Sequence, residues 1–393
     1  MPIIENNKAC CGCRACEEIC PKVAISMVED AETFIYPKIN KSLCINCDLC
    51  EKVCPLNFKD FIPYNDVRAY VGTYRSKEVI YESSSGGAFT AIYETLIDKG
   101  YIVYGVRYNE NLKVIHDSAR TLEECKSFRK SKYVQSNTNG CFEKIANDLK
   151  SGSKVLFSGV SCQCAALDSY LKTKRINSEN LITVNLLCHG VPSQRMFDEY
   201  KKAAEEEEEA SMFFQFRFKN KMTQGSLVNS RTAFAEFKNG HHYIRTIADD
   251  AFLRGYYRRL FYRPSCAVCP FTRKERITDF TIADAWHIEE KYPEYNPLEG
   301  VSLLLLNTQK AFENLDKIQE KMELRKISIG WVWNSQGLFS EPTTMHPNRD
   351  KFFSLWKKVG LKKAVFISTR PTLKMRISKY IPSKIKQKIK ELW

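Results

Sequence analysis

The chain has 393 residues, of which 44% are hydrophobic and 12% aromatic, and its formal net charge is +14 at pH 7. This composition excludes a disordered protein, and the longest aliphatic run, at residues 303–306, is far shorter than the roughly 20 residues that span a bilayer. The sequence begins without the apolar stretch of a secretory signal, so we expect a cytoplasmic protein whose thiols stay reduced.

The N-terminal region carries nine of the 16 cysteines within its first 54 residues. Two runs, at residues 10–21 and 44–55, share the spacing Cys-x2-Cys-x2-Cys-x3-Cys-Pro. In two-cluster ferredoxins three cysteines of such a run hold one [4Fe-4S] cluster and the fourth ligates the other. The spacing predicts Cys10, Cys13, Cys16 and Cys54 for one cluster, and Cys44, Cys47, Cys50 and Cys20 for the other. Cys11 is out of register and is predicted to be unligated.

After a polar linker that contains Pro63, strand-like and helix-like patterns alternate along the chain. Helices are predicted at residues 86–100 and 164–173, and a third begins near Ser193. A hairpin that turns at Asn239-Gly240 is predicted within residues 232–247. The other predicted strands are residues 69–74, 101–108, 154–160, 181–190, 214–218 and 276–286.

This order predicts three regions. Residues 1–60 form an α+β ferredoxin-like dicluster domain, which is fused to a larger α/β domain with a mainly parallel sheet at residues 66–330. Residues 331–393 form a C-terminal extension that ends in a basic tail.

The tail carries half of the net charge, because residues 370–393 hold eight basic side chains against Glu391 alone. Isoleucine or leucine recurs there about every fourth residue, which is typical of a helix on an anionic membrane surface. A solvated helix or one packed on a partner is the alternative. Because the basic residues concentrate in the tail and do not alternate with stacking aromatic residues, we expect no nucleic-acid binding.

Four dispersed cysteines form a second candidate metal site. Cys162 and Cys188 each follow a predicted strand, at the edge where α/β sheets place their ligands, and Cys266 and Cys269 form a Cys-x2-Cys pair. Together they could hold zinc or a third iron-sulfur cluster. Four separate buried cysteines are the alternative.

Two further motifs carry candidate binding residues. Gly86 and Gly87 open a predicted helix whose free amides could bind a phosphate, although the motif is not the Rossmann fingerprint. Lys132 and Tyr133 offer a cation and an aromatic ring suited to a phosphate or a flavin. A serine-capped helix and an ordinary surface segment are the respective alternatives, and His189 could equally be structural.

Seven motifs in order resemble the coenzyme F420 hydrogenase/dehydrogenase beta-subunit family, with a ferredoxin domain in front. They are SSSGGAFT, SKYVQS, VLFSGVSCQCAAL, CHGVPS, YRPSCAVCPF, DFTIADAW and GVSLLLLNT. The resemblance implies FAD and a third [4Fe-4S] cluster held by the four dispersed cysteines. The FAD contacts that it implies are Ser85, Gly86, Gly87, Lys132, Tyr133, Gln135, Ser136, His189 and Gly190, of which Lys132 and His189 are the candidate catalytic residues.

The resemblance and the cysteine motifs together predict a flavoprotein oxidoreductase. Electrons pass between the ferredoxin-type clusters and a two-electron organic acceptor, a deazaflavin or another conjugated molecule, with FAD joining one-electron and two-electron chemistry. A redox protein or ferredoxin is the expected partner. The alternative is a non-catalytic subunit that delivers electrons to a partner enzyme.

Overall fold

The computed structural model describes residues 8–64, 66–209, 213–217, 222–223, 226–227, 232–296 and 298–370. The predicted membrane-binding tail, residues 370–393, lies outside the described residues except for Arg370. Within them, no helix combines the length and the apolar character that crossing a membrane requires.

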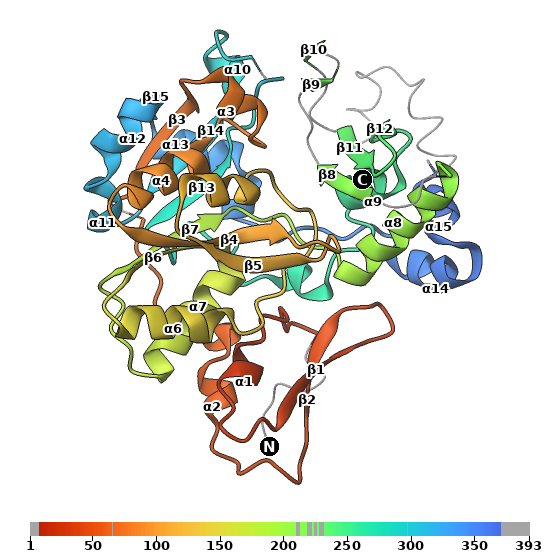
Figure 1. Ribbon diagram of the computed structural model, residues 1–393, viewed down its shortest axis with the longest axis horizontal. Helices are drawn as coiled ribbons and strands as arrows, with labels where there is room; N and C mark the ends of the chain where they lie inside the picture. Colours follow the sequence, from red (N-terminus) through yellow and green to blue (C-terminus); the bar gives the residue numbers. More distant parts are fainter. Residues whose placement is uncertain are drawn as a thin grey trace, which may run out of the picture.

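The N-terminal region folds as two matching turns around a hairpin (Figure 1). Corresponding positions of the two cysteine runs, Gly12 with Asn46 and Arg14 with Asp48, have left-handed backbone conformations. Arg14 and Asp48 are the N-caps of two one-turn helices. The duplication in the sequence is therefore also a duplication in the structure. The elements are α1 (Ala15–Glu18), β1 (Ile25–Glu29), β2 (Ile35–Ile39), α2 (Leu49–Lys52) and η1 (Pro55–Asn57).

One eight-stranded sheet, in the order β15-β3-β14-β13-β7-β6-β4-β5, forms the centre of the molecule. Its contiguous strands β13, β7, β6 and β4 are parallel, as predicted. Antiparallel strands flank them on both sides, so the sheet is mixed towards its edges. The strands are β3 (Arg68–Tyr74), β4 (Tyr101–Tyr108), β5 (Val114–Ala119), β6 (Lys154–Val160), β7 (Leu181–Leu186), β13 (Phe280–Asp284), β14 (Ser302–Leu306) and β15 (Met322–Ile327).

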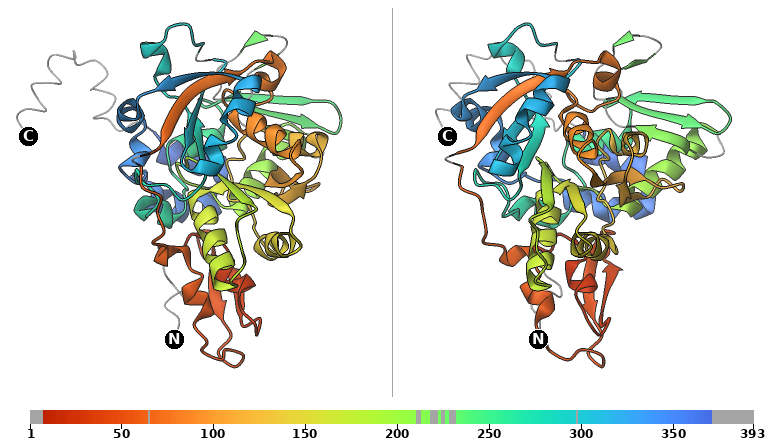
Figure 2. Two further views of the ribbon diagram at one scale, coloured as in Figure 1. Left: turned by 90° about the vertical axis from the view of Figure 1, so that its left-hand side faces the viewer. Right: turned by 60° about the vertical axis from the view of Figure 1, so that its left-hand side comes forward.

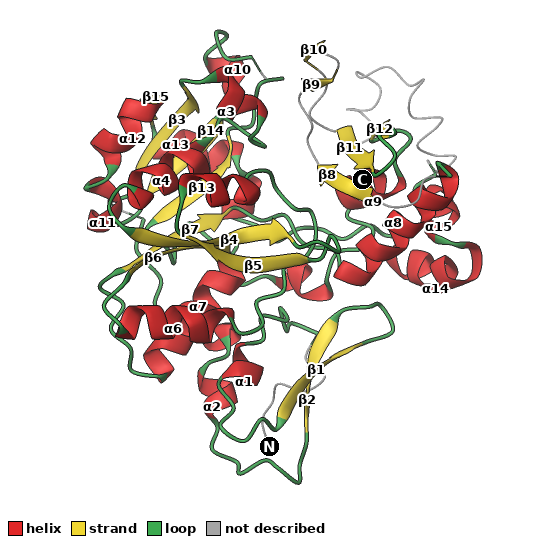
Figure 3. Cartoon of the chain, in the orientation of Figure 1, coloured by secondary structure: helices red, strands yellow, loops and turns green. Residues whose placement is uncertain are grey.

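Helices cover both faces of this sheet (Figure 3). Alternate residues of β4 and β6, such as Val103 and Leu156, pack against α4 on one face, while Ile102 and Val155 pack against α6 and α7 on the other. This alternation is the period of two that a sheet buried on both faces requires. The helices around the sheet are α3 (Lys77–Tyr81), α4 (Ala88–Ile97), α5 (Leu122–Cys125), η2 (Lys126–Phe128), α6 (Cys141–Lys150), α7 (Ser161–Thr173), α10 (Ile288–Lys291), α11 (Gln309–Phe312), α12 (Leu315–Lys321), α13 (Ile329–Ser335) and η4 (Gly337–Phe339).

A second core lies beside the sheet, where α8, α9, α14 and α15 enclose aromatic side chains such as Phe197, Phe252 and Phe352. Helices α14 and α15 belong to the predicted C-terminal extension, and the boundary placed at residue 330 stays a prediction. The predicted hairpin at Asn239-Gly240 is confirmed as β11 and β12. The elements are α8 (Gln194–Glu207), β8 (Phe213–Arg217), β9 (Met222–Thr223), β10 (Ser226–Leu227), β11 (Thr232–Phe237), β12 (His242–Thr246), α9 (Ala251–Tyr257), η3 (Pro264–Val268), α14 (Arg349–Val359) and α15 (Leu361–Ser368).

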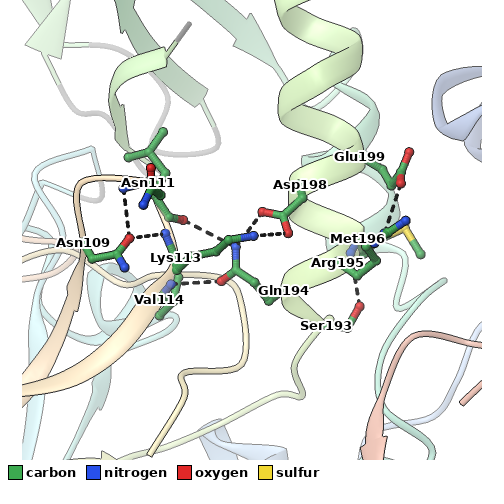
Figure 4. Close-up of polar contacts among 11 residues, drawn as sticks. Asn109, Asn111, Lys113, Val114, Ser193, Gln194, Arg195, Met196, Asp198 and Glu199 are labelled. Atoms are coloured by element: carbon green, nitrogen blue, oxygen red, sulfur yellow. Dashed lines mark hydrogen bonds and ion pairs between the residues drawn. The ribbon is translucent and has the colours of Figure 1, made fainter. Parts of the chain in front are cut away.

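The first turn of α8 is fastened to the turn between β4 and β5 (Figure 4). The amide of Val114 donates to the side-chain oxygen of Gln194 at 2.9 Å, and Lys113 forms an ion pair with Asp198. Ser193 caps the helix by accepting from the amide of Met196 at 3.1 Å, as predicted for this position. These contacts fix one end of residues 187–193, the loop that follows β7.

The N-terminal region packs beneath α6 and α7, as the two views of Figure 2 show. The carboxylate of Glu18 accepts hydrogen bonds from the amides of Gly140, Phe142 and Glu143, at 2.9, 3.1 and 3.2 Å, at the start of α6. A carboxylate in this position satisfies amides that have no partner within the helix and complements the helix dipole. Glu32 adds an ion pair with Arg349, and a buried apolar cluster that contains Ile19 and Val53 together with residues of α6 and α7 completes the interface.

Candidate functional site

Four cysteines from the two N-terminal runs surround one cavity. Its walls include Cys20, Cys44, Cys47 and Cys50, and the cavity has a volume of about 20 Å³. The amide of Ala24 donates to the sulfur of Cys20 at 3.3 Å. These are the four thiols that the crossed ligand pattern assigns to one cluster, and their placement fits that assignment.

The other predicted set is Cys10, Cys13, Cys16 and Cys54. Cys13 and Cys16 of this set pack against the apolar cluster around α6 and α7, which belong to the central sheet and its helices, here called the sheet domain. Burial, with repulsion from Cys10 and Cys54, raises the pKa of the Cys16 thiol. The amide of Gly12 donates to the sulfur of Cys10 at 3.4 Å. Amide-to-sulfur hydrogen bonds of this kind stabilise thiolates and tune iron-sulfur clusters.

A larger cavity brings together the four dispersed cysteines, Cys162, Cys188, Cys266 and Cys269. The volume of this cavity is about 60 Å³. Cys162 lies in the first turn of α7, directly after β6, and Cys188 follows the neighbouring parallel strand β7. The short helix η3, which opens with Pro264, supplies Cys266, and Cys269 is its C-cap. The structure thus brings the four predicted cysteines to the walls of one cavity, and the metal site itself stays a prediction.

Among the described residues, no three His, Cys, Asp or Glu side chains are grouped so that they could hold a metal ion, and the four thiols share only the cavity that they line. Burial is the main cause that raises the pKa of Cys188 and that of Cys266, the latter to about 11. Cys188 accepts from the amide of Gly190 at 3.4 Å. Thiolates in such a place need positive charge, and bound metal supplies it.

Cys11, which the sequence analysis left unligated, lines the same cavity. The side chain of Gln135 donates to the carbonyl oxygen of Cys11 at 2.8 Å, and Arg263 donates to the carbonyl oxygen of Cys10 at 2.7 Å. Arg263 also donates to the carbonyl oxygen of Ile35 at 2.7 Å and is only 1% exposed. The sheet domain therefore holds the loop of the first cysteine run in place.

The two glycines predicted to bind phosphate have close protein neighbours. A Cβ atom at Gly86 would lie 2.4 Å from the carbonyl oxygen of Gly72, and one at Gly87 would lie 2.9 Å from Tyr74. Gly87 is also left-handed, with φ of 92°, at the N-cap of α4. Packing against β3 therefore requires glycine at both positions, whatever ligand the start of α4 binds. Ser85 donates to the carbonyl oxygen of Val301 at 2.9 Å.

Lys132 lies next to this glycine turn, because the amide of Ser131 donates to the hydroxyl of Ser84 at 2.7 Å. Its ammonium group donates to the carbonyl oxygens of Ser127 and Arg129, at 2.9 and 2.7 Å. Among the described residues, no carboxylate forms an ion pair with it. Desolvation, with repulsion from Lys130, lowers the pKa of Lys132 to about 7. A half-buried cation without a carboxylate favours an anionic ligand, so Lys132 fits the phosphate contact predicted for it.

The remaining predicted flavin contacts, Gln135, Ser136, His189 and Gly190, contact or line segments that carry the cysteines. Ser136 accepts from the side chain of Gln163 at 2.9 Å, while Gln135 holds the Cys11 loop. His189 and Gly190 line the larger cavity. A row of aromatic rings connects the two places: Tyr262 lies against Gly190, and Tyr256 lies between Tyr262, at 5.1 Å, and Tyr133, at 4.2 Å.

Arg263 was not predicted as part of the site, and Gln135 was predicted to contact FAD. Arg263 stands three residues before Cys266, within a motif already singled out, but its partners are backbone carbonyls of the N-terminal region. A hydrogen bond to a backbone carbonyl does not depend on which residue carries that carbonyl, so the sequence pattern cannot predict it. The doubled cysteine at Cys10-Cys11 was the one available signal that the first run departs from the second.

Comparison with known proteins gives two family matches. Residues 152–329 match the C-terminal part of the coenzyme F420 hydrogenase/dehydrogenase beta-subunit family, and residues 9–58 match the family described as "4Fe-4S dicluster domain". A chain in a structure of the F420-reducing [NiFe] hydrogenase complex from Methanosarcina barkeri is 17% identical, with a TM-score of 0.46, over 80% of this chain and 96% of that chain. No curated protein matches the chain.

The dicluster domain and the cysteine geometry define an iron-sulfur protein of the electron-transferring oxidoreductase class. Within that class, residues 152–329 carry the C-terminal part typical of the coenzyme F420 hydrogenase/dehydrogenase beta-subunit family, and a 4Fe-4S dicluster domain precedes them at the N-terminus. The resemblance identified from the seven motifs is thus confirmed. The family match begins at residue 152, so the flavin contacts predicted at residues 85–87 and 132–136 lie outside it.

Proposed function

We propose that the protein is an iron-sulfur flavoprotein that passes electrons between its ferredoxin-type clusters and a two-electron organic acceptor, a deazaflavin or another conjugated molecule. The observation that carries this proposal is the larger cavity, where four dispersed cysteines meet the loop of the first cysteine run. A centre in this cavity would lie between the N-terminal clusters and the sheet domain. FAD, when bound, supplies the exchange between one-electron and two-electron chemistry.

The metal proposed for the larger cavity is a third [4Fe-4S] cluster. Its ligands are Cys162, Cys188, Cys266 and Cys269. The thiols line the walls of a cavity, and among the described residues they do not form a group that could hold one metal ion, which suits a cluster of several irons better than a single zinc ion. The N-terminal clusters keep the two ligand sets predicted from the spacing.

The flavin is proposed to bind between the start of α4 and the row of tyrosines. Lys132 supplies a cation for the phosphates, and the first turn of α4 supplies amides and the positive end of a helix dipole. Tyr133, which stacks on Tyr256 with ring planes 13° apart, supplies a flat surface near the rings. His189 lies at the cysteine cavity, so its role there would be to orient groups at the centre.

Anaerobic purification with iron, sulfide and flavin analysis tests the cofactors. Three clusters require about 12 iron atoms per chain, and two require about 8. The Cys266→Ala, Cys269→Ala variant should lose about four irons and keep the flavin, because its ligands lie in the cysteine cavity and those of FAD lie beside α4. An unchanged iron count, or the loss of one zinc, would overturn the third cluster.

Steady-state reduction of small conjugated acceptors by the isolated, dithionite-reduced chain tests the enzyme activity. A deazaflavin and several quinone-like or nitroaromatic acceptors form the screen, with the Cys266→Ala, Cys269→Ala variant as the matched control. Turnover by the parent that the variant lacks supports a relay through the cavity. Protein that is loaded with iron and flavin but reduces no acceptor would identify a subunit that passes its electrons to a partner enzyme.

A further inference from the structure

Three apolar side chains are exposed beside the smaller cysteine cavity, and we call them the apolar rim. Val23 is 79% exposed, Ile45 56% and Leu43 48%. Ile45 is a wall residue of this cavity, and the other two are next to wall residues in the chain. The amide of Asn40 donates to the carbonyl oxygen of Ala24 at 2.7 Å, which joins the two loops that carry the rim. Exposed apolar side chains that gather in one place mark an interaction site.

Val23 is an unfavourable residue for the free chain. Its φ of 49° is left-handed, a conformation that a β-branched residue rarely adopts. Asparagine adopts this conformation more readily and would expose no large apolar side chain. Backbone strain of this kind is concentrated at functional positions. Valine therefore lowers the stability of the free chain here, and a partner that covers its side chain would offset that cost.

The apolar rim lies at the open end of the β1–β2 hairpin. The turn at the closed end carries Glu32, which forms an ion pair with Arg349 of α14. Val23 precedes β1 and Leu43 follows β2, so both stand at the other end, in the part of the chain that Figures 1 and 2 show at one end of the molecule. Of the 16 cysteines, all of which the structure describes, Cys47 alone is exposed, and it lines the smaller cavity. A redox centre in this cavity is therefore accessible from the side of the rim.

The segments that carry the apolar rim are basic. Residues 20–24 and 38–52 contain four lysines against two carboxylates, Asp48 and Glu51. Within the described residues, none of these lysines forms an ion pair. Apolar surface flanked by such cations complements an apolar patch that is flanked by carboxylates. The lysines, all exposed, are Lys22, Lys38, Lys41 and Lys52.

This charge favours a protein of opposite charge over two other occupants. A second copy of the chain, bound by two-fold symmetry, would place the same lysines against one another. An anionic membrane would neutralise the lysines, but lipid exchanges no electrons with a redox centre beside Cys47. An acidic redox protein satisfies both the charge and the exposed cavity.

We propose that the apolar rim and its lysines are the docking surface of a small acidic electron-donor protein. In each encounter one electron is transferred, so that the centre of the donor is oxidised and the cluster of the smaller cavity is reduced. Interfaces of electron-transfer proteins are small and transient, so a few apolar side chains and their flanking charges are sufficient. This inference rests on the ferredoxin-type clusters of the proposed function and not on the third cluster.

The test uses an acidic plant-type [2Fe-2S] ferredoxin as the probe. Calorimetry measures the binding of the oxidised probe to the full-length, iron-loaded chain, and stopped-flow absorbance measures electron transfer from the reduced probe. The Val23→Asn, Ile45→Ser variant should lower the affinity and the second-order rate constant by about tenfold each. Val23→Asn alone should also weaken binding, yet it should not lower the midpoint of chemical unfolding, because asparagine relieves the strain.

The lysines should act through charge. Lys22→Gln, Lys41→Gln should lower the rate constant by about tenfold at low ionic strength, and the difference from the parent should disappear at high salt. Lys358→Gln, Lys363→Gln removes the same charge from exposed positions of α14 and α15, and Leu122→Ser removes a side chain that is 42% exposed on α5. Both controls should bind the probe as the parent does.

Reduced methyl viologen separates the two possible failures, because this small molecule needs no docking surface. If the parent holds no iron, or if the viologen cannot reduce it, the proposed function fails together with the inference. If the viologen reduces the parent but the ferredoxin neither binds nor reduces it, only the inference is overturned. Equal affinity and equal rates for the parent and the Val23→Asn, Ile45→Ser variant would also overturn it.

The other two occupants are further outcomes of the test. Light scattering that shows a dimeric parent and a monomeric Val23→Asn, Ile45→Ser variant would assign the apolar rim to a second copy of the chain. Loss of binding to phosphatidylserine vesicles in Lys22→Gln, Lys41→Gln, with ferredoxin binding unchanged, would assign it to a membrane surface. Either result would overturn the inference.

Discussion

The two cysteine cavities differ in what brings their thiols together. The smaller cavity takes all four cysteines from residues 20–50, on short loops that pack on a small apolar cluster around Ile25 and Ile39. The larger cavity takes its thiols from segments between Cys11 and Cys269, and it lies at the ends of β6 and β7 in the central sheet. The first is organised by sequence spacing and the second by the fold.

This difference has a thermodynamic meaning. A short segment that buries little apolar surface obtains its stability from metal, so that metal binding and folding are one event. A cavity at the end of a sheet with apolar cores on both faces keeps its shape when the metal is absent.

Removal of iron should have the largest effect, and only on the N-terminal region. Anaerobic treatment with a strong iron chelator should abolish hydrogen-exchange protection in β1 and β2 while leaving protection in β6 and β7 close to that of the loaded protein. Hydrogen exchange with mass spectrometry measures both in one experiment. Equal loss of protection in the two regions would break the comparison, since the sheet would then also depend on metal.

Replacing Arg263 by methionine should weaken the attachment between the two regions. The carbonyl oxygens of Cys10 and Ile35 would lose charged donors at 2.7 Å in a buried place, which should cost about 2–4 kcal/mol. Chemical unfolding followed by a probe in the N-terminal region measures this cost. Arg349→Met is the control, because it removes the ion pair between Arg349 and Glu32 that also joins the two regions. This variant should lower the free energy of unfolding by less than Arg263→Met does.

Replacing Glu18 by alanine should have a smaller effect on the same interface. Three amides at the start of α6 would lose their acceptor, at an expected cost of about 1–3 kcal/mol. The loss should appear as faster hydrogen exchange in the first turn of α6. Glu17→Ala serves as the control, because Glu17 binds Arg14 within the N-terminal region. Equal exchange of α6 in both variants would show that Glu18 does not anchor the helix.

The smallest effect should be that of Lys132→Gln on FAD affinity. Because desolvation lowers the pKa of Lys132 to about 7, the free side chain is charged below that pH and loses its charge as the pH rises. FAD binding should therefore weaken by up to about tenfold per pH unit above pH 7 in the parent, and this dependence should be absent in the variant. Flavin fluorescence titration measures both. The exposed Lys126→Gln is the control, and a parent without pH dependence would contradict the phosphate role of Lys132.

Many features of the fold and of the cysteine sites can be predicted from the sequence because they depend on short stretches of residues. The spacing of the cysteine runs predicts which thiols share the smaller cavity, and apolar runs predict β4 and β6 at their observed bounds. Cys162 and Cys188 were placed together because parallel strands end at one edge of a sheet. Helix α7 begins at Ser161, ahead of the predicted start, because Gln163 caps it through the amide of Val160.

The rest depends on contacts that no short pattern contains. The antiparallel partners at the sheet edges, β5 and β15, pair with strands through backbone hydrogen bonds that many sequences could form. Gly86 was selected for a phosphate, yet its immediate neighbour is the carbonyl oxygen of Gly72. The place of Cys11 depends on Arg263, more than 200 residues away along the chain. Such pairings are set by the tertiary fold.

The span of the larger cavity along the chain also sets an order of events during protein synthesis. The ligands of both N-terminal clusters have left the ribosome soon after Cys54, whereas the larger cavity is incomplete until Cys269 and Arg263 have followed. At roughly 5–20 residues per second, this gap of about 200 residues lasts on the order of 10–40 seconds. Cys11 has no partner from the sheet domain during that time. The N-terminal cysteines are therefore available for binding iron well before the larger cavity can form.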